Sequence, residues 1–277
     1  MSRETCPPAL RHRRIGIVGA GTMGQALITG LLARGVSRRQ LMAAEITPSI
    51  RAAVGRRCGI EVTDDAARVA RRSHILLLAV KPQQFPDLLS AIAPSVCRTH
   101  LVISIAAGIR LSWLQARLPR VPLVRVMPNL PATVGSGFSA LTRGRWASAH
   151  HLAIATAIFT AVGDIVELPE RHFDAMTAVS GSGPAYLFFL VDAWEQAARS
   201  LGLPQAVAAR AIRRTLHGSL RLLESRDETP QELMQQVASK GGTTEAALNR
   251  LAARRVAWHM TEALRAAARR SKELSWS

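Results

Sequence analysis

A glycine-rich turn near the start of the chain offers the clearest chemistry. Its spacing is G-x-G-x-x-G, and it lies between the apolar run Ile15–Val18 and a helical pattern that starts near residue 22. In this order the first glycine permits a tight turn, the second lets the backbone approach a pyrophosphate, and the third lets the helix pack on the strand. The helix N-terminus then presents N–H groups to the phosphates. A dinucleotide site is predicted, and an ordinary glycine-rich turn is the alternative. The predicted contacts are Gly19, Gly21, Thr22, Met23 and Gly24.

Glu45 ends the second strand pattern, 21 residues after Gly24. A carboxylate there can accept hydrogen bonds from an adenosine ribose, and it repels a 2′-phosphate. A solvated glutamate at a strand end is the alternative, and Thr47 and Arg51 lie close enough in sequence to bind a phosphate. We therefore expect NADPH or NADH as the cofactor, with Glu45 favouring NADH.

Two more loops follow apolar strands, at the edge where ligands bind in open α/β sheets. The first consists of Ala79, Val80, Lys81 and Pro82. In the second, Pro128 and Pro131 frame Asn129, so that a rigid loop can aim its amide at a nicotinamide or a substrate. The alternatives are a surface lysine at position 81 and a purely structural turn at position 129. Both loops are predicted to contribute to the cofactor site.

Two segments in the second half place glycines and hydroxyls where helices are expected to begin. One runs from Ser180 through Ser182 to Pro184, and the other from Ser239 to Thr244. Such helix N-termini bind carboxylates without an arginine. Capping alone needs only one serine or threonine, and paired glycines are costly unless something approaches the backbone closely. We interpret both segments as candidate substrate contacts.

The elements that must position these residues fall into two groups. Up to residue 168, short apolar strands alternate with helical patterns, which predicts a Rossmann-type doubly wound parallel sheet. The expected strands are 15–18, 41–44, 74–80, 101–105 and 123–126, with a further pair at 138–141 and 165–168 around a helix at 147–161. The expected helices between the first strands are 22–34, 48–57, 64–71, 83–93 and 110–118.

After residue 169 only helical spacing remains. The expected helices are 183–201, 204–223, 230–238, 243–253 and 256–273. Their many apolar faces suggest burial by another subunit, with a self-contained bundle as the alternative. We therefore divide the chain into a flexible tail (1–13), a dinucleotide-binding domain (14–168) and an all-helical domain (169–277).

Composition narrows the function classes. The net charge of +17 would suit a nucleic-acid binder, but aromatics are only 4% and no basic run alternates with stacking aromatics. The three cysteines, Cys6, Cys58 and Cys97, lack metal-site or disulfide spacing, so no metal is expected. No apolar run approaches the roughly 20 residues of a membrane helix, and the N-terminus lacks a signal-peptide pattern. A cytoplasmic protein with no membrane partner is expected.

Several ordered motifs resemble the pyrroline-5-carboxylate reductases, over nearly the whole chain from Arg14 to Leu274. The most specific are the stretch from Asp174 to Tyr186, with the sequence DAMTAVSGSGPAY, and the SKGGTT segment at 239–244 with its flanking Pro230 and Leu248. The ending RSKEL at 270–274 also resembles the family's last helix. The resemblance implies hydride transfer from NAD(P)H to the C=N bond of 1-pyrroline-5-carboxylate, giving L-proline.

The resemblance also implies roles for individual residues. Thr244 would contact the ring nitrogen as the catalytic hydrogen-bond donor. The substrate carboxylate would bind among Ser239, Lys240, Gly241, Gly242 and Thr243, with Ser180 and Ser182 also in contact with substrate. The helical domains of two chains would interlock, so that each site takes the 239–244 segment from the partner, and the dimers can assemble further, to a decamer.

Three positions depart from the family pattern. Lys240 stands where proline is usual, Leu130 where threonine is usual, and Glu245 where an apolar residue is common. Two other functions therefore stay open. One is a related reductase of another cyclic imine or of a small keto or hydroxy acid, and the other is a non-catalytic nucleotide- or nucleic-acid-binding relative.

Overall fold

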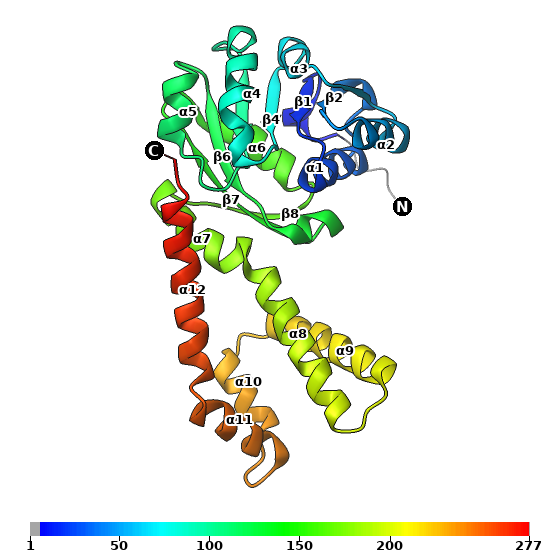
Figure 1. Cartoon of the computed structure of the whole chain (residues 1–277), viewed down its shortest axis with the longest axis vertical. Helices are drawn as coiled ribbons and strands as arrows, with labels where there is room; N and C mark the ends of the chain where they lie inside the picture. Colours follow the sequence, from blue (N-terminus) through cyan, green and yellow to red (C-terminus); the bar gives the residue numbers. More distant parts are fainter. Residues whose placement is uncertain (1–5, 277) are drawn as a thin grey trace. The chain divides into compact units, whose positions relative to one another are not determined.

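The computed structural model describes residues 6–276 (Figure 1). They form two compact units. The first ends at Ser182 and also includes the segment that begins at Ala267, and the second comprises Gly183–Ala266. The boundary predicted after residue 168 falls within the first unit, and as a division of function it stays a prediction. No helix among the described residues is long and apolar enough to cross a membrane.

An eight-stranded sheet forms the centre of the first unit. Its order is β3-β2-β1-β4-β5-β6-β7-β8, and within it only β6 and β7 pair antiparallel. The strands are β1 (Ile15–Val18), β2 (Leu41–Ala44), β3 (Glu61–Thr63), β4 (Ile75–Leu78), β5 (Leu101–Ser104), β6 (Leu123–Met127), β7 (Gly137–Arg143) and β8 (Gly163–Glu167). The predicted doubly wound, mostly parallel sheet is confirmed. The strand β3 was not predicted, because three residues at a partly exposed edge carry no apolar run.

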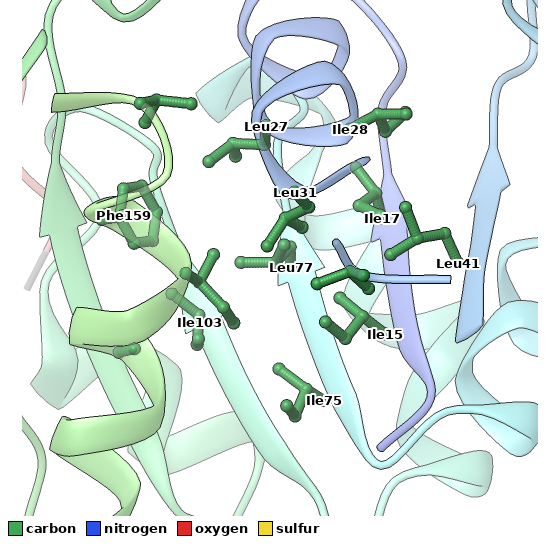
Figure 2. Close-up of a cluster of buried hydrophobic side chains, with 14 of the residues drawn as sticks. Ile15, Ile17, Leu27, Ile28, Leu31, Leu41, Ile75, Leu77, Ile103 and Phe159 are labelled. Carbon is green, nitrogen blue, oxygen red and sulfur yellow. The ribbon is translucent and has the colours of Figure 1, made fainter. Parts of the chain in front are cut away.

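Both faces of the sheet are buried, which explains why its central strands are apolar throughout. Along β1, Ile15 and Ile17 join one cluster of buried side chains, whereas Val18 joins the other. Figure 2 shows the first cluster, in which Leu27 and Leu31 lie over the strands beside Phe159. Each such side chain contributes about 1.5–3 kcal/mol when fully buried. The sheet is therefore held from both sides and keeps its strand ends in fixed positions.

The helices of the first unit cover both of these faces. On the face shown in Figure 2 lie α1 (Thr22–Ala33), α2 (Pro48–Cys58) and α6 (Ala149–Phe159). On the other face lie α3 (Ala66–Arg72), α4 (Phe85–Ile92) and α5 (Leu111–Arg117). Their bounds agree with the helices expected from the sequence to within a few residues.

The segment before β1 differs from the flexible tail that we expected. Among its described residues, Pro8–Leu10 form a short 3-10 helix, and the side chain of Leu10 is fully buried in the core. The Gln40 side-chain amide donates to the carbonyls of Leu10 and Arg13, at 3.0 Å each. One apolar side chain thus anchors a segment whose composition is polar and basic. The rest of the predicted tail, residues 1–5, lies outside the described residues.

The last described residues also pack on the first unit. The Trp276 N–H donates to the Gly108 carbonyl at 2.8 Å, and its ring meets that of Trp113 edge to face at 5.3 Å. Nearby, the Ser271 hydroxyl donates to the Asp174 carboxylate at 2.7 Å. The end of the chain is therefore fixed by both apolar and polar contacts.

The second unit is all-helical, as predicted, but its own core is small. Its elements are α8 (Gly183–Ser200), α9 (Gln205–Glu224), α10 (Pro230–Val237), α11 (Thr243–Ala253) and most of α12 (Val256–Glu273). Ala198, Ala208 and Ile212 are its buried apolar residues among those described. By contrast, Phe189 is 71% exposed, Phe188 58% and Trp258 56%. A single copy of this unit therefore leaves much apolar surface exposed.

Candidate active site

The glycine turn has the local geometry that a dinucleotide requires. Gly19 adopts φ +95°, and a Cβ there would lie 2.6 Å from the Ala79 carbonyl oxygen. A Cβ on Gly24 would collide with the Gly19 carbonyl, which explains how α1 comes so close to the turn. At Gly21, by contrast, a Cβ would meet nothing within 4 Å. The first and third glycines therefore serve packing, whereas the space at the second is open.

Glu45 holds this turn in place. One carboxylate oxygen accepts the Ala20 N–H and the other accepts the Thr47 N–H, each at 2.9 Å. The residue is only 9% exposed. The sequence placed Glu45 beside a ribose, but its two bonds to the backbone could not be foreseen from a motif. Glu45 therefore connects the end of β2 to the glycine turn while still lining the cleft beside them.

That cleft has a volume of ≈ 720 Å³ and follows the carboxyl ends of β1, β2 and β4. Six of the predicted cofactor residues line it, namely Gly19, Gly21, Glu45, Ala79, Val80 and Lys81. Its lining also contains Asp64, Asp65 and Asp87, which were not predicted as site residues. The pattern Thr63-Asp64-Asp65 indicated only a helix start, and Asp65 does cap α3 by accepting the Arg68 N–H at 2.8 Å. Four carboxylates and one ammonium line it, and we call it the acidic cleft, although Arg51 and Arg71 pair with two of these carboxylates.

Arg51 and Asp64 form a pair at the mouth of the acidic cleft. The Arg51 guanidinium donates to the Glu45 carbonyl at 2.8 Å and lies 3.3 Å from the Asp64 carboxylate. Arg51 was one of two residues, with Thr47, that the sequence offered as phosphate binders. Its charge is opposed by Asp64 in the structure.

Asn129 and Ser180, which the sequence treated separately, are hydrogen-bonded to each other. The Asn129 side chain donates to the Ser180 hydroxyl at 3.1 Å and accepts the Phe138 N–H at 2.9 Å. The amide thus joins the loop after β6 to the segment that contains Ser180. Neither Asn129 nor Pro82 lines the acidic cleft. A contact of either residue with cofactor or substrate stays a prediction.

The segment around Ser180 ends a π-helix and leads directly into α8, which begins at Gly183 as the sequence predicted. Phe173–Met176 form α7, and Thr177–Gly181 continue as a π-helix in which the Ser182 N–H donates to the Thr177 carbonyl at 2.8 Å. The run S-G-S-G-P resembles a helix break, but a wider helical turn accommodates it. Isolated π-turns often occur at functional sites. Ser180 therefore belongs to a helical bulge, and Ser182 lies between that bulge and the first residue of α8.

The Ser239–Thr244 loop lies in the second unit and does begin a helix. Gly242 is the N-cap residue of α11 without any side-chain cap, and Gly241 adopts φ +71°. The Gly241 N–H donates to the Glu245 carboxylate at 2.7 Å. A carboxylate of the chain itself therefore occupies one of the amides that the sequence assigned to a substrate carboxylate. Lys240 is exposed, and Thr244 is half-buried in the first turn of α11.

The first-unit residues fit a dinucleotide by two independent features. The N-terminus of α1 has no side-chain cap, so its N–H groups are available to a pyrophosphate. The open space at Gly21 is where such a group would approach the backbone. The cleft volume lies within the range of small-molecule and cofactor sites.

Comparisons with known proteins agree with this geometry. The family profile described as pyrroline-5-carboxylate reductase dimerisation matches residues 170–274, and that described as NADP oxidoreductase, coenzyme F420-dependent, matches residues 14–108. The chain is 38% identical to a pyrroline-5-carboxylate reductase of Synechocystis, over 94% of this chain and 98% of that protein.

Two solved structures are also similar. A pyrroline-5-carboxylate reductase from Coxiella burnetii has a TM-score of 0.88 and 30% identity, covering 96% of this chain and 99% of that one. The Plasmodium falciparum pyrroline carboxylate reductase with NADP bound has a TM-score of 0.88 and 26% identity, covering 96% and 99%.

Proposed function

The chain belongs to the pyrroline-5-carboxylate reductase family, and from this premise we propose how its residues act. The protein is an NAD(P)H-dependent oxidoreductase that reduces the C=N bond of 1-pyrroline-5-carboxylate to give proline. The observation that carries this conclusion on the structural side is the cleft at the glycine turn. It combines an uncapped helix N-terminus with open space at Gly21.

In this proposal the first unit holds the nicotinamide cofactor. Gly19, Gly21, Thr22, Met23 and Gly24 bind its pyrophosphate, and Ala79, Val80, Lys81, Pro82 and Asn129 contact its remainder. When bound, the cofactor would supply a hydride to the imine carbon, and the ring nitrogen would take up one proton from water by way of the Thr244 hydroxyl. The chain's contribution is to orient the reacting groups and to place charge around them.

The second unit supplies the substrate contacts in this proposal. Backbone N–H groups of the loop at 239–244 hold the substrate carboxylate, and the Thr244 hydroxyl donates a hydrogen bond to the ring nitrogen, which stabilises charge there. Ser180 and Ser182 of the first unit also contact the substrate. Because Glu245 already occupies the Gly241 N–H, the incoming carboxylate displaces it or binds the neighbouring amides.

NADH is the cofactor that we propose the cleft prefers. Support comes from the acidic lining, in which Glu45 and Asp64 lie near the end that a 2′-phosphate would reach. A further −2 charge beside these carboxylates is repelled, and the Arg51 guanidinium that would offset it already faces Asp64.

The protein is an oligomer, and we propose a homodimer as its basic form. The second unit exposes aromatic side chains on α8, such as Phe188 and Phe189. Monomeric proteins rarely leave large apolar patches exposed to solvent, so this surface is one that a partner chain can cover. Each active site would then combine the cleft of one chain with the 239–244 loop of its partner, and dimers can associate into a decamer.

The test is a spectrophotometric assay of the purified full-length protein with 1-pyrroline-5-carboxylate, run with NADH and NADPH in parallel. Loss of the reduced-nicotinamide absorbance, with proline as product, is expected, and it should be faster with NADH. Protein that is folded and binds NADH but oxidises neither cofactor would contradict the proposed reaction. Faster oxidation of NADPH would contradict only the cofactor preference.

A further inference from the structure

A second cleft lies at the opposite edge of the sheet, where β1 and β2 begin. Its volume is ≈ 380 Å³. Four arginines line it against a single carboxylate, that of Glu61, and they are Arg14, Arg38, Arg39 and Arg72. The net charge of this lining is positive, whereas that of the acidic cleft, the proposed coenzyme cleft, is negative. The reductase function gives this cleft no role.

The positive charge of this cleft is only partly neutralised. Arg72 pairs with Glu61 at 3.1 Å, but Glu61 also pairs with Arg68. The side chains of Arg14 and Arg39 make no hydrogen bond or ion pair within residues 6–276. Elsewhere in the same unit Arg51 faces Asp64 and Arg71 faces Asp65. Arg38 has no carboxylate partner among these residues either, so three guanidinium groups at one concave site lack a counter-charge within the described part of the chain.

Arg38 is held in place by the end of a helix. Its Nε donates to the carbonyl of Cys58, the last residue of α2, at 3.0 Å. Gly59 follows with φ +63°, and a Cβ there would lie 3.1 Å from the Arg38 side chain. The left-handed glycine thus makes room for Arg38, whose two terminal nitrogens remain available. This anchoring lowers the entropy that Arg38 would lose on binding an anion.

Apolar side chains also line the cleft, but they offer little surface to a ligand. They are Ile15, Leu41, Met42 and Ile60, each of which is buried. The guanidinium groups are therefore the part of the lining that a bound molecule would contact. Arginine presents paired N–H donors that match the oxygen atoms of a phosphate.

We propose that this cleft is a binding site for a small phosphorylated molecule carrying adjacent anionic groups. A small molecule is favoured over nucleic acid because the site is concave and because no aromatic side chain lines it for base stacking. The proposal does not depend on the reductase reaction. It gives a local role to part of the net charge of +17.

The pKa of the neighbouring His74 reflects the positive charge of these arginines. Burial lowers the pKa of His74, and the guanidinium groups of Arg14 and Arg13 lower it further. Its Nδ1 accepts the Arg14 N–H at 2.9 Å, which requires an unprotonated nitrogen. The positive charge of the cleft therefore comes from its arginines and not from His74.

The test is isothermal titration of the full-length protein with pyrophosphate, in the presence of saturating NADH so that the coenzyme cleft is filled. One pyrophosphate per chain is expected to bind. The double variant Arg14→Ala/Arg39→Ala should weaken this binding by about tenfold or more, because two charge-assisted contacts are lost. Both side chains are exposed, so their removal should leave the melting temperature unchanged.

The matched control is Arg56→Ala/Arg98→Ala, which removes the same charge from exposed positions outside the cleft. Its affinity for pyrophosphate should stay within about twofold of wild type. An equal loss in both double variants, or binding that never saturates, would show that only the overall charge matters and would overturn the proposal. A short single-stranded oligonucleotide that displaces pyrophosphate and loses affinity in the Arg14/Arg39 variant would overturn the assignment to a small molecule.

Discussion

The two units of this chain stabilise themselves in different ways. In the first, central strands are buried on both faces and the glycine turn is braced by Glu45 through two backbone hydrogen bonds. In the second, three small or aliphatic residues form the buried core while Phe188, Phe189 and Trp258 remain exposed. The first unit therefore buries its own apolar side chains, whereas the second leaves many of its own exposed. In the proposed homodimer a second copy covers them.

If the exposed apolar surface of the second unit binds a partner chain, a charge placed on that surface should lower turnover and leave the affinity for NADH unchanged. Phe189→Glu places a charge on a side chain that is 71% exposed in the single chain. We expect loss of the dimer by light scattering and a fall in turnover of about a hundredfold, because the substrate loop loses its position. NADH affinity, measured by fluorescence titration, should stay unchanged.

Val134→Glu provides the control, because Val134 is 77% exposed but lies in the first unit. It should keep both the dimer and turnover. Wild-type turnover in a monomeric Phe189→Glu variant would remove the proposed dependence of the reaction on a partner.

Within the glycine turn, the second and third glycines should respond in opposite ways. Gly24→Ala brings a Cβ onto the Gly19 carbonyl, so we expect a loss of about 1–3 kcal/mol in unfolding free energy. Gly21→Ala meets no protein atom, so stability should change by less than about 0.5 kcal/mol. Its dissociation constant for NADH should rise about tenfold, because the methyl group fills the space expected for the pyrophosphate. Equal melting temperatures for the two variants would contradict this division of roles.

Asp64→Asn tests what sets the cofactor preference. Removing this carboxylate leaves the Arg51 guanidinium unopposed at the mouth of the cleft. We expect kcat/KM with NADPH to rise about five- to tenfold relative to NADH. Asp87→Asn removes the same charge from another residue of the cleft and should shift the ratio less. An unchanged ratio in Asp64→Asn would mean that the pair does not decide the preference.

Glu245→Gln tests whether a carboxylate of the helical unit competes with the substrate carboxylate. The substitution keeps an acceptor for the Gly241 N–H but removes the charge that competes with a substrate carboxylate. KM for 1-pyrroline-5-carboxylate should fall about two- to fivefold while kcat stays constant. A KM that rises would indicate that Glu245 supports the loop rather than opposing the substrate.

Chemical modification of Cys97 should have the smallest effect on turnover. Cys97 is an exposed thiol of the first unit and is distant in sequence from the glycine turn. Hydrogen bonds from Thr99, then from His100, lower the pKa of Cys97 to about 7. Its thiolate therefore forms as pH rises through about 7, and its reaction with a disulfide reagent should accelerate over that range. Burial raises the pKa of Cys6, and Cys58 is buried, so both should react more slowly. Cys97→Ser should remove the fast phase, and modified wild type should keep its turnover.

Local rules predicted most of the fold, since apolar runs of four or five residues and helical spacing need no distant partner. The glycine turn was predictable for the same reason, as its three roles follow from adjacent residues. The π-helix at Thr177–Gly181 was not, because Gly181 and the following Gly183 resemble a break in the helix. Nor were the bonds of Glu45 to Ala20 and of Asn129 to Ser180, because they join segments that only the folded chain brings together.

The most direct test of a site built from two chains is complementation between two inactive variants. Gly21→Val disables the coenzyme cleft, and Thr244→Ala disables the substrate loop. After the two are unfolded together and refolded, half of randomly paired dimers are mixed, and each mixed dimer contains one site with an intact cleft and an intact loop. We predict recovery of about a quarter of wild-type turnover with NADH and 1-pyrroline-5-carboxylate. No recovery in dimers shown to be mixed would contradict the account and place each complete site within one chain.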